Sequence, residues 1–226
     1  MSSRIAIVAG AGSGLGQAAA LKLHANGLTV VAVDRNEVGL KELPAGIRIE
    51  VADATDPTAP GPLVDRLAAD VGPPDVLVNT IGAYELGDAL TVTPETLRQM
   101  IDVNLGPALW LTQAVVPHMQ RRGSGAIVHV AARQGVEPTA GVAAYGLSKA
   151  ALVHLARTQD AELRELGIRV NVVLPHVMAT AKNKALFPPE ALTGAVDPDE
   201  VAQIIALLVS DAAVSTSGAL VPAYGA

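Results

Sequence analysis

Seven short runs rich in aliphatic and β-branched residues alternate with longer helix-like segments along this chain of 226 residues. The runs expected to form strands are Arg4–Ala9, Leu28–Val33, Ile47–Val51, Asp75–Asn79, Ala126–Ala131, Ile168–Leu174 and Ala219–Val221. The segments expected to form helices are Leu15–Asn26, Pro62–Val71, Pro94–Arg122, Ala143–Leu166 and Pro198–Ser210. Strands joined by helices pair in parallel, and the helices cover both faces of the sheet. The pattern predicts an α/β fold with a doubly wound parallel sheet of about seven strands.

The amino-acid composition agrees with this fold and limits the kinds of partner that the protein is expected to bind. Half of the residues are hydrophobic but only 2% are aromatic, so Ala, Val, Leu and Ile must build the core, as suits buried parallel strands. The net charge is -6, and no basic run is longer than Arg121-Arg122, which argues against nucleic acid as a partner. No apolar run reaches membrane-spanning length and MSSRIAIVAG does not resemble a signal peptide, so we expect a cytoplasmic protein with no membrane partner. With no cysteine and no metal-ligand spacing among five histidines, no metal site is expected.

Prolines mark the boundaries of several segments. Thr93 is a candidate N-cap before Pro94, which suits the first position of a helix. Pro107 and Pro117 are expected to bend or divide the helix that follows. The segment Pro175–Pro189 has several helix breakers and no clear period, so we expect a loop over a site.

The first expected strand runs directly into the glycine-rich sequence AGAGSGLG, which precedes a helix. Glycines allow a tight turn that approaches a pyrophosphate closely, and free N–H groups at a helix N-terminus favour its negative charge. Gly10, Gly14 and Gly16 have the spacing GxxxGxG instead of the commoner GxGxxG, and alone they would also suit a purely structural turn. Their position after the first strand favours the dinucleotide interpretation.

Asp34 ends the second expected strand, 20 residues after Gly14. A carboxylate at this place can accept hydrogen bonds from an adenosine ribose, and it would repel the extra phosphate of NADP. NAD(H) is therefore the favoured cofactor. NADP(H) stays an alternative because Arg35 could pair with a 2′-phosphate. A solvated carboxylate at the end of a strand is the simpler interpretation of Asp34.

Tyr145 and Lys149 stand four residues apart in YGLSK, on one face of an expected helix. A nearby ammonium favours the ionised phenol and lowers a tyrosine pKa from about 10 towards a range useful for proton transfer. An isolated Tyr and Lys are more often ordinary surface residues, so this interpretation depends on the surrounding motifs.

Four further motifs complete an ordered set. They are VADATD with Asp53, NTIG from Asn79 to Gly82, DVNL with Asn104, and PHVMAT from Pro175 to Thr180. In this order the motifs resemble those of the short-chain dehydrogenase/reductase family, over nearly the whole chain. The resemblance implies a single Rossmann-type NAD(P)-binding domain over residues 1–226 and an oxidoreductase that passes a hydride between NAD(P) and a small-molecule substrate.

The resemblance also implies roles for individual residues. It assigns Asn104, Tyr145 and Lys149 to catalysis, with Tyr145 as the acid–base group. The cofactor-binding residues that it implies are Gly10, Ser13, Gly14, Leu15, Gly16, Asp34, Asp53, Ala54, Asn79, Gly82, Tyr145, Lys149, Pro175, Val177 and Thr180. Family members form homodimers or homotetramers through helices that correspond to Pro94–Arg122 and Ala143–Leu166, so a homo-oligomer is expected.

Simpler structural roles stay open for some of these residues. Asp53 would also suit a turn, and Asn79 or Thr180 would also suit bonds to the local backbone. His129 is most simply a core or sheet-face residue. Asn104, in the middle of a helix between apolar neighbours, needs a buried partner.

Ala132 stands where most family members carry a serine, 13 residues before Tyr145, and Gly135 three residues later fixes the frame. The serine hydroxyl hydrogen-bonds the reacting carbonyl, and losing one such donor costs on the order of 3 kcal/mol of transition-state stabilisation. Ordinary ketone reduction should therefore be handicapped. A second departure is His176, where the family usually has glycine.

Three interpretations of Ala132 follow. The substrate could be a conjugated imine, an enone or a quinonoid ring, as in the dihydropteridine reductase branch of the family. That branch is similar in the alanine, in YGxxK, and in the pattern found here as Leu174-Pro175, Thr180 and Asn183-Lys184. Alternatively, another residue could act as the donor, and the candidates are His176, Gln134, Arg133 and Tyr84, while Ser148 lies on another side of the helical turn.

The third interpretation is that catalysis has been lost and the chain is a dinucleotide-binding sensor or structural protein. The presence of Asn104, Tyr145 and Lys149 together favours an active enzyme, because a binding module would need Lys149 but not Tyr145.

Overall fold

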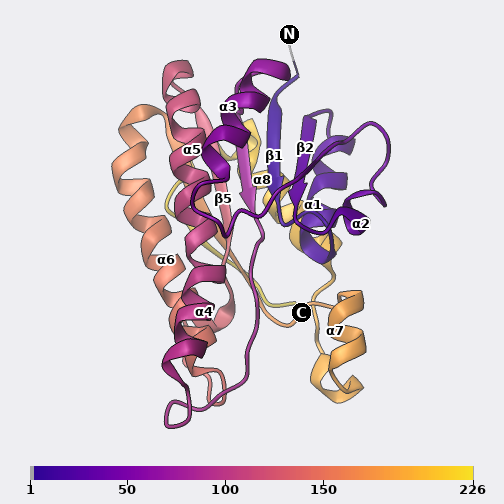
Figure 1. Ribbon diagram of the computed structural model, residues 1–226, viewed down its shortest axis with the longest axis vertical. Coiled ribbons are helices and arrows are strands. Elements are labelled where there is room, and N and C mark those ends of the chain that lie inside the picture. Colours follow the sequence, from indigo (N-terminus) through magenta and orange to yellow (C-terminus); the bar gives the residue numbers. More distant parts are fainter. Residues whose placement is uncertain (1–2, 226) are drawn as a thin grey trace.

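The computed structural model describes residues 3–225 as one parallel sheet with helices on both faces (Figure 1). Positions 1, 2 and 226, which the expected domain includes, lie outside the described residues. The strands are β1 (Ile5–Ala9), β2 (Thr29–Asp34), β3 (Arg48–Val51), β4 (Val76–Asn79), β5 (Gly125–Val130), β6 (Ile168–Pro175) and β7 (Leu220–Ala223). They pair in parallel in the order β3-β2-β1-β4-β5-β6-β7, which confirms the doubly wound sheet.

Helices cover the two faces in separate groups. The helices are α1 (Gly14–Ala25), α2 (Glu37–Leu40), α3 (Pro60–Asp70), α4 (Pro94–Asn104), α5 (Gly106–Arg122), α6 (Ala143–Leu163), α7 (Ala181–Leu186) and α8 (Pro198–Val209). Short 3-10 turns occupy Arg133–Gly135, Arg164–Leu166, Pro189–Leu192 and Asp211–Ala213. Helices α1 and α8 pack together on one face, whereas α3, α5 and α6 cover the other. Within residues 3–225, none of these helices has the length and apolar character needed to cross a membrane.

Alternate residues of each strand serve the two layers of the core. In β1, Ala6 and Val8 face the layer that contains α1 and α8, whereas Ile7 and Ala9 face the layer that contains α3 and α5. Both layers consist of aliphatic side chains, with Met119 as an unbranched filler. This is the core that the scarcity of aromatic residues predicts.

The expected helix Pro94–Arg122 is divided into α4 and α5 at Leu105. Thr93 caps α4 as expected, because its hydroxyl accepts a hydrogen bond from Thr96 N at 3.1 Å. Pro107 lies at the start of α5, where its lack of an N–H group breaks the hydrogen-bond ladder of a continuous helix. Pro117 lies inside α5 and does not divide it.

Two short helices were not predicted from the sequence pattern. Asn36 caps α2 by accepting a hydrogen bond from Gly39 N at 3.2 Å. Thr180 caps α7 in the same way, with Asn183 N as the donor at 3.1 Å. The presence of α7 corrects the expectation of an irregular loop over Pro175–Pro189.

The strand order reverses between β1 and β4, so the carboxyl ends of these two strands meet at the centre of the sheet. Thr80 N, directly after β4, donates to the Ala9 carbonyl at 2.9 Å. Ligands of open α/β sheets bind at such a reversal, beyond the carboxyl ends of the strands. Both α7 and the segment between β4 and α4 lie beyond this edge (Figure 1).

Candidate active site

The glycine-rich turn after β1 lies against the end of β4 and has no room for side chains. A Cβ atom at Gly10 (φ +86°) would come within 2.4 Å of Thr80 Oγ1, and one at Gly16 within 2.0 Å of the Gly10 carbonyl oxygen. Ser13 is the N-cap residue of α1, yet its side chain makes no capping hydrogen bond. The first N–H groups of α1 therefore lack a side-chain cap, and this arrangement suits a negatively charged pyrophosphate. Leu15, in the first turn of α1, is buried.

The segment after β6 borders the same turn. A Cβ atom at Gly14 would lie 3.2 Å from Thr180 Cγ2, so the two segments are in close contact. Pro175 is buried at the end of β6, and the Val177 carbonyl accepts a hydrogen bond from Val196 N at 2.8 Å. The structure thus brings Thr180 to the glycine turn and uses Val177 to hold the backbone between them.

Asp34 ends β2 beside the glycine turn. Its carboxylate accepts hydrogen bonds from Gly12 N at 2.9 Å and from Asn36 N at 2.8 Å. Asn36 Nδ2 also donates to the Gly12 carbonyl, at 3.4 Å. These contacts fix the carboxylate next to the turn, and a carboxylate has further lone pairs for other donors.

Asp53 bonds mainly within its own segment after β3. Its Oδ1 atom accepts from Thr55 N at 2.9 Å and from Thr55 Oγ1 at 2.6 Å, and Oδ2 lies 3.4 Å from an Arg35 guanidinium nitrogen. The Thr55 hydrogen bonds are the main reason that the pKa of Asp53 is lower than usual, and Arg35 adds to the effect. These contacts correspond to the turn role that the sequence leaves open for Asp53. Ala54 is buried next to it.

Asn79, at the end of β4, forms a hydrogen bond through the oxygen of its side-chain amide but, within residues 3–225, not through the nitrogen. Its Oδ1 atom accepts from Ile81 N at 3.1 Å, whereas Nδ2 is buried and has no hydrogen-bond partner among the described residues. An unpaired buried donor is costly and calls for a partner. A polar ligand at this edge of the sheet would supply an acceptor.

Asn104 is fixed at the end of α4 by a buried chain of hydrogen bonds. Ala83 N donates to Asn104 Oδ1 at 2.9 Å, and Asn104 Nδ2 donates to the Ala83 carbonyl at 3.0 Å. Asn104 Nδ2 also donates to Ser148 Oγ at 3.0 Å, and Ser148 Oγ donates to the Tyr145 carbonyl at 2.7 Å. The chain joins α4 to α6 and supplies the buried partner that Asn104 needs. It also occupies the Ser148 hydroxyl, so this group cannot replace the missing serine.

Lys149 is buried, and its ammonium lies against Gly82. Its Nζ atom donates to the Val130 carbonyl at 3.1 Å. A Cβ atom at Gly82 would come within 3.0 Å of Lys149 Nζ and 2.7 Å of Asn104 Oδ1, so glycine permits both side chains to reach this point. Burial lowers the pKa of Lys149 to about 8.

Tyr145 lies one helical turn before Lys149, whose Nζ atom is 5.9 Å from the centroid of the tyrosine ring. Burial, with a smaller contribution from Tyr84, raises the pKa of Tyr145 above its ordinary value. This direction is opposite to the lowering that the sequence predicts from Lys149, because the penalty of burying a phenolate is the main contribution. Tyr145 therefore holds its proton at neutral pH.

Methyl groups directly follow β5, where the family resemblance places a hydroxyl. Ala131 and Ala132 are each 4% exposed, so no side-chain oxygen comes from either position. Gly135 packs against α6, since a Cβ atom there would lie 2.8 Å from the Lys149 carbonyl oxygen. The close packing keeps the segment that contains Ala132 near α6, which carries Tyr145 and Lys149.

Two of the alternative donors have clear positions. Arg133 forms an ion pair with Glu137 at 2.6 Å and lies 4.9 Å from the centroid of the Tyr224 ring. Tyr84 packs edge-on against Tyr145, with 4.9 Å between ring centroids. Tyr84 is thus the candidate donor that contacts Tyr145.

A family model for the short chain dehydrogenases matches residues 4–191. The chain belongs to the short-chain dehydrogenase family. It is an oxidoreductase of a family that uses NAD(P)(H) and acts on small molecules.

Relatives and solved structures agree along the whole length of this short-chain dehydrogenase. It is 30% identical to meso-2,3-butanediol dehydrogenase from Serratia marcescens, and the match covers 99% of this chain and 94% of that protein. An oxidoreductase of the same family from Burkholderia thailandensis has 30% identity and a TM-score of 0.89, with 100% and 92% of the two chains covered. L-sorbose reductase from Gluconobacter frateurii, complexed with NADPH and L-sorbose, has 25% identity and a TM-score of 0.91, with 100% and 96% covered.

The structure adds three residues to this short-chain dehydrogenase site. Thr80 Oγ1 donates to the Ala9 carbonyl at 2.9 Å, where the strand order reverses. Ala83 binds Asn104 through its backbone, which no side-chain pattern could show. Phe187 lies edge-on to Tyr84, 5.9 Å between centroids, and as the one phenylalanine of the chain it could have been noticed from the sequence. Within residues 3–225, no cluster of three or more His, Asp or Glu side chains could hold a metal ion.

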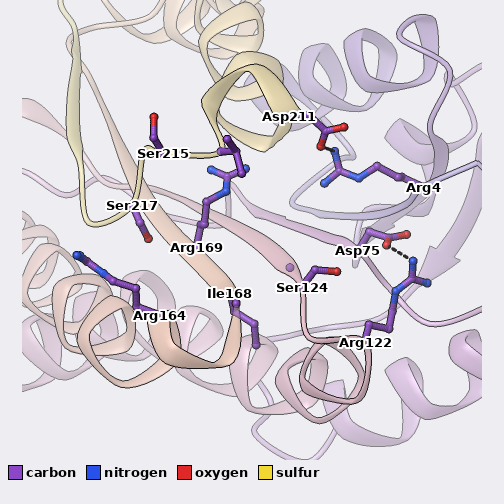
Figure 2. A pocket seen from close by; sticks show the side chains of 13 residues that line it. Arg4, Asp75, Arg122, Ser124, Arg164, Ile168, Arg169, Asp211, Ser215 and Ser217 are labelled. Carbon is purple, nitrogen blue, oxygen red and sulfur yellow. Dashed lines mark ion pairs between the residues drawn. The ribbon is translucent and has the colours of Figure 1, made fainter.

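A cavity of about 590 Å³ lies at the opposite end of the sheet, at the amino ends of β1, β4, β5 and β6 (Figure 2). Four arginines line it, and each has a partner in the protein. The contacts are Arg4 to Asp211 (3.5 Å), Arg122 to Asp75 (2.8 Å), Arg164 to Asp160, and Arg169 to the carbonyls of Leu208, Ser210 and Thr216. We therefore interpret this cavity as a structural feature, separate from the active site.

Proposed function

We propose that this short-chain dehydrogenase binds NAD(P) as one domain over residues 1–226 and reduces a conjugated carbonyl, imine or quinonoid small molecule. The observation that carries the proposal is a complete set of Asn104, Tyr145 and Lys149 next to a methyl group at Ala132. The set supplies proton transfer, whereas the methyl group cannot polarise a carbonyl. Conjugation activates an acceptor without that hydrogen bond, so such substrates lose least from the missing hydroxyl.

The residues at the carboxyl edge fit a dinucleotide. The uncapped start of α1 suits a pyrophosphate, and the unpaired amide of Asn79 needs a partner at the same edge. NAD(H) is the favoured cofactor because the Asp34 carboxylate would repel a 2′-phosphate. Arg35, which could offset that repulsion, pairs with Asp53 instead.

The bound nicotinamide supplies the hydride of the reduction. The protein holds a proton at Tyr145 Oη and releases it to the substrate oxygen or nitrogen. Burial keeps that phenol protonated at neutral pH. With a pKa of about 8, Lys149 stays charged at neutral pH and stabilises the phenolate that remains.

Ala132 also favours a second candidate function, that of a dinucleotide-binding sensor or structural protein. A protein of this kind would need Lys149 to hold a ribose but would have no use for the Tyr145 proton. The two functions therefore differ in what the phenol of Tyr145 does.

We also propose that two or four copies assemble through α5 and α6. Ala150 and Ala161 are exposed on α6, and such small side chains allow a helix of a second copy to approach closely. Sedimentation equilibrium would distinguish these states from a monomer.

The proposed activity can be tested with NADH and a panel of ketones, enones, quinones and quinonoid dihydropterin, followed by loss of NADH absorbance. We expect turnover of the conjugated compounds and slower turnover of simple ketones. Tyr145→Phe should lower kcat by roughly 10²- to 10⁴-fold, because it removes the proton donor. The Kd for NADH should change less than about twofold, since the ring is kept, and NADPH should bind more weakly than NADH.

Each outcome separates the two candidate functions. Binding of NADH without turnover of any panel member would favour the sensor. Turnover that survives Tyr145→Phe would show that another group donates the proton.

A further inference from the structure

Aromatic side chains are rare in this chain and are not used to fill its core. The sequence has one Trp, three Tyr and one Phe, and none of them is among the buried hydrophobic residues of the described chain. Three of the five form a continuous cluster, which we call the aromatic cluster: Tyr145, Tyr84 and Phe187. Most of the aromatic side chains of this chain are thus gathered at the proposed proton donor.

The aromatic cluster joins three separate segments. Tyr145 is on α6, Tyr84 is in the segment between β4 and α4, and Phe187 follows α7. Tyr84 lies in the middle, 4.9 Å from the Tyr145 ring and 5.9 Å from the Phe187 ring between centroids, at interplanar angles of 66° and 80°. The segments that carry Tyr84 and Phe187 both lie beyond the carboxyl ends of the strands, where we expect the substrate to enter (Figure 1).

Tyr84 remains available to a ligand in spite of these contacts. It is 44% exposed, and each of its two ring contacts is edge-on, which covers less of a ring than stacking does. Its neighbour Leu86 is 67% exposed, and Leu186, next to Phe187, is 65% exposed. Large apolar side chains are therefore exposed in both segments, and the partially exposed ring of Tyr84 offers an aromatic contact to a substrate.

We propose that Tyr84 and Phe187 select substrates that carry a planar aromatic or quinonoid ring next to the reacting group. Aromatic rings bind one another favourably in offset-stacked and edge-on arrangements. A planar aromatic substrate would therefore gain binding energy from Tyr84 and Phe187 that a saturated substrate of equal size would not gain. Aromatic contacts would also orient a substrate that lacks a hydrogen bond at Ala132. This inference rests on the proposed function, because it names the substrate class of the same site.

The test uses two vicinal diketones of similar size, 1-phenyl-1,2-propanedione and 1-cyclohexyl-1,2-propanedione, with NADH as the reductant. For Tyr84→Leu we expect kcat/KM for the phenyl compound to fall about 5- to 10-fold and that for the cyclohexyl compound less than twofold. Phe187→Leu should act in the same direction, and Tyr84→Phe should keep the selectivity because it keeps the ring. Trp110→Leu is the matched control, since it removes an aromatic ring from α5 that makes none of the ring contacts of the cluster.

The ratio of the two kcat/KM values is the decisive quantity. A disturbance of Tyr145 by the Tyr84 substitution would lower both values equally and leave the ratio unchanged, and that result would overturn the inference. The same holds if Trp110→Leu changes the ratio as much as Tyr84→Leu does. Melting temperatures of all variants show that each remains folded.

Failure of the proposed function is distinguishable from failure of this inference. If the unsubstituted protein turns over neither diketone, binding of the phenyl compound to its NADH complex is measured by saturation-transfer NMR. Ring recognition predicts saturation of the phenyl protons that is lost in Tyr84→Leu and kept in Tyr84→Phe. Equal binding by all three proteins would reject the role of Tyr84, whatever the catalytic outcome.

Discussion

At the scale of single residues, the proposed chemistry of this site depends on the methyl group of Ala132. Ala132 stands where the family resemblance places the hydroxyl that would polarise a carbonyl, and the hydroxyl of Ser148, on the same helix as the proposed catalytic pair, is already bonded to Asn104 and to the Tyr145 carbonyl. Tyr145 can give a proton, but the described residues around it show no fixed side-chain donor at the position of Ala132. The reactivity of the substrate must then replace what the protein lacks.

Restoring that hydroxyl should widen the range of substrates. Ala132→Ser is expected to raise kcat/KM for a simple ketone such as cyclohexanone by about tenfold or more, because the added donor stabilises charge on the carbonyl oxygen in the transition state. Quinone reduction should change much less. Steady-state rates with NADH on both substrates measure the effect.

Ala131→Ser is the matched control. It adds the same hydroxyl at the neighbouring position, which is equally buried at 4% exposure. An equal gain from both substitutions, or no gain from Ala132→Ser in a folded protein, would mean that the missing hydroxyl does not limit the reaction.

At the scale of elements, the length of a helix or strand determines whether the sequence can predict it. The strands and the long helices are visible because several apolar residues repeat with the period of each structure. Helices α2 and α7 are too short for a period, and each depends on one capping residue, Asn36 or Thr180. The division at Leu105 was foreseeable from Pro107, which cannot donate a backbone hydrogen bond.

Contacts between elements were not foreseeable. His129 on β5 lies fully buried between two helices, 3.0 Å from Gln159 Oε1 on α6 and 3.5 Å from Thr112 Oγ1 on α5. The sequence predicts a core or sheet-face residue here but not its partners, because they are 30 and 17 residues away. Burial, assisted by the charge of Lys149, lowers the pKa of His129 to about 4, although the Gln159 bond opposes this effect.

This histidine should make stability depend on pH. Between pH 6.5 and about 4, the unfolded chain binds a proton at His129 and the folded protein does not, so the free energy of unfolding falls as the pH falls. His129→Leu should remove up to about 3 kcal/mol of that decrease. Urea unfolding at a series of pH values measures the difference between the two proteins.

Gln159→Leu provides the control for lost hydrogen bonding. It breaks the same contact but keeps the imidazole, so the pH dependence should persist although the protein is less stable. Parallel pH curves for the His129→Leu variant and the unsubstituted protein would contradict a neutral, buried His129.

At the scale of the whole molecule, the two ends of the sheet have different roles. The carboxyl end carries the glycine turn, the proposed catalytic residues and the aromatic cluster. The sequence places its motifs at this end because they follow the strands in order, but it does not predict the aromatic cluster. The amino end holds the arginine-lined cavity (Figure 2). Its contacts were not predictable, since Arg169 binds only backbone carbonyls that are about 40 or more residues away.

This division predicts that stability and activity respond separately to substitution. Arg169→Met should lower the free energy of unfolding by about 2 to 4 kcal/mol, because it leaves carbonyls of Leu208, Ser210 and Thr216 without their charged donor. Arg4→Met, in the same cavity, should have a much smaller effect, because the partner Asp211 is 98% exposed and such ion pairs contribute little. Both variants should keep kcat/KM and the Kd for NADH within about twofold, since the site lies at the other end of the strands. Urea unfolding and steady-state kinetics of the two variants test this, and a large change in KM with little loss of stability would mean that the cavity takes part in function.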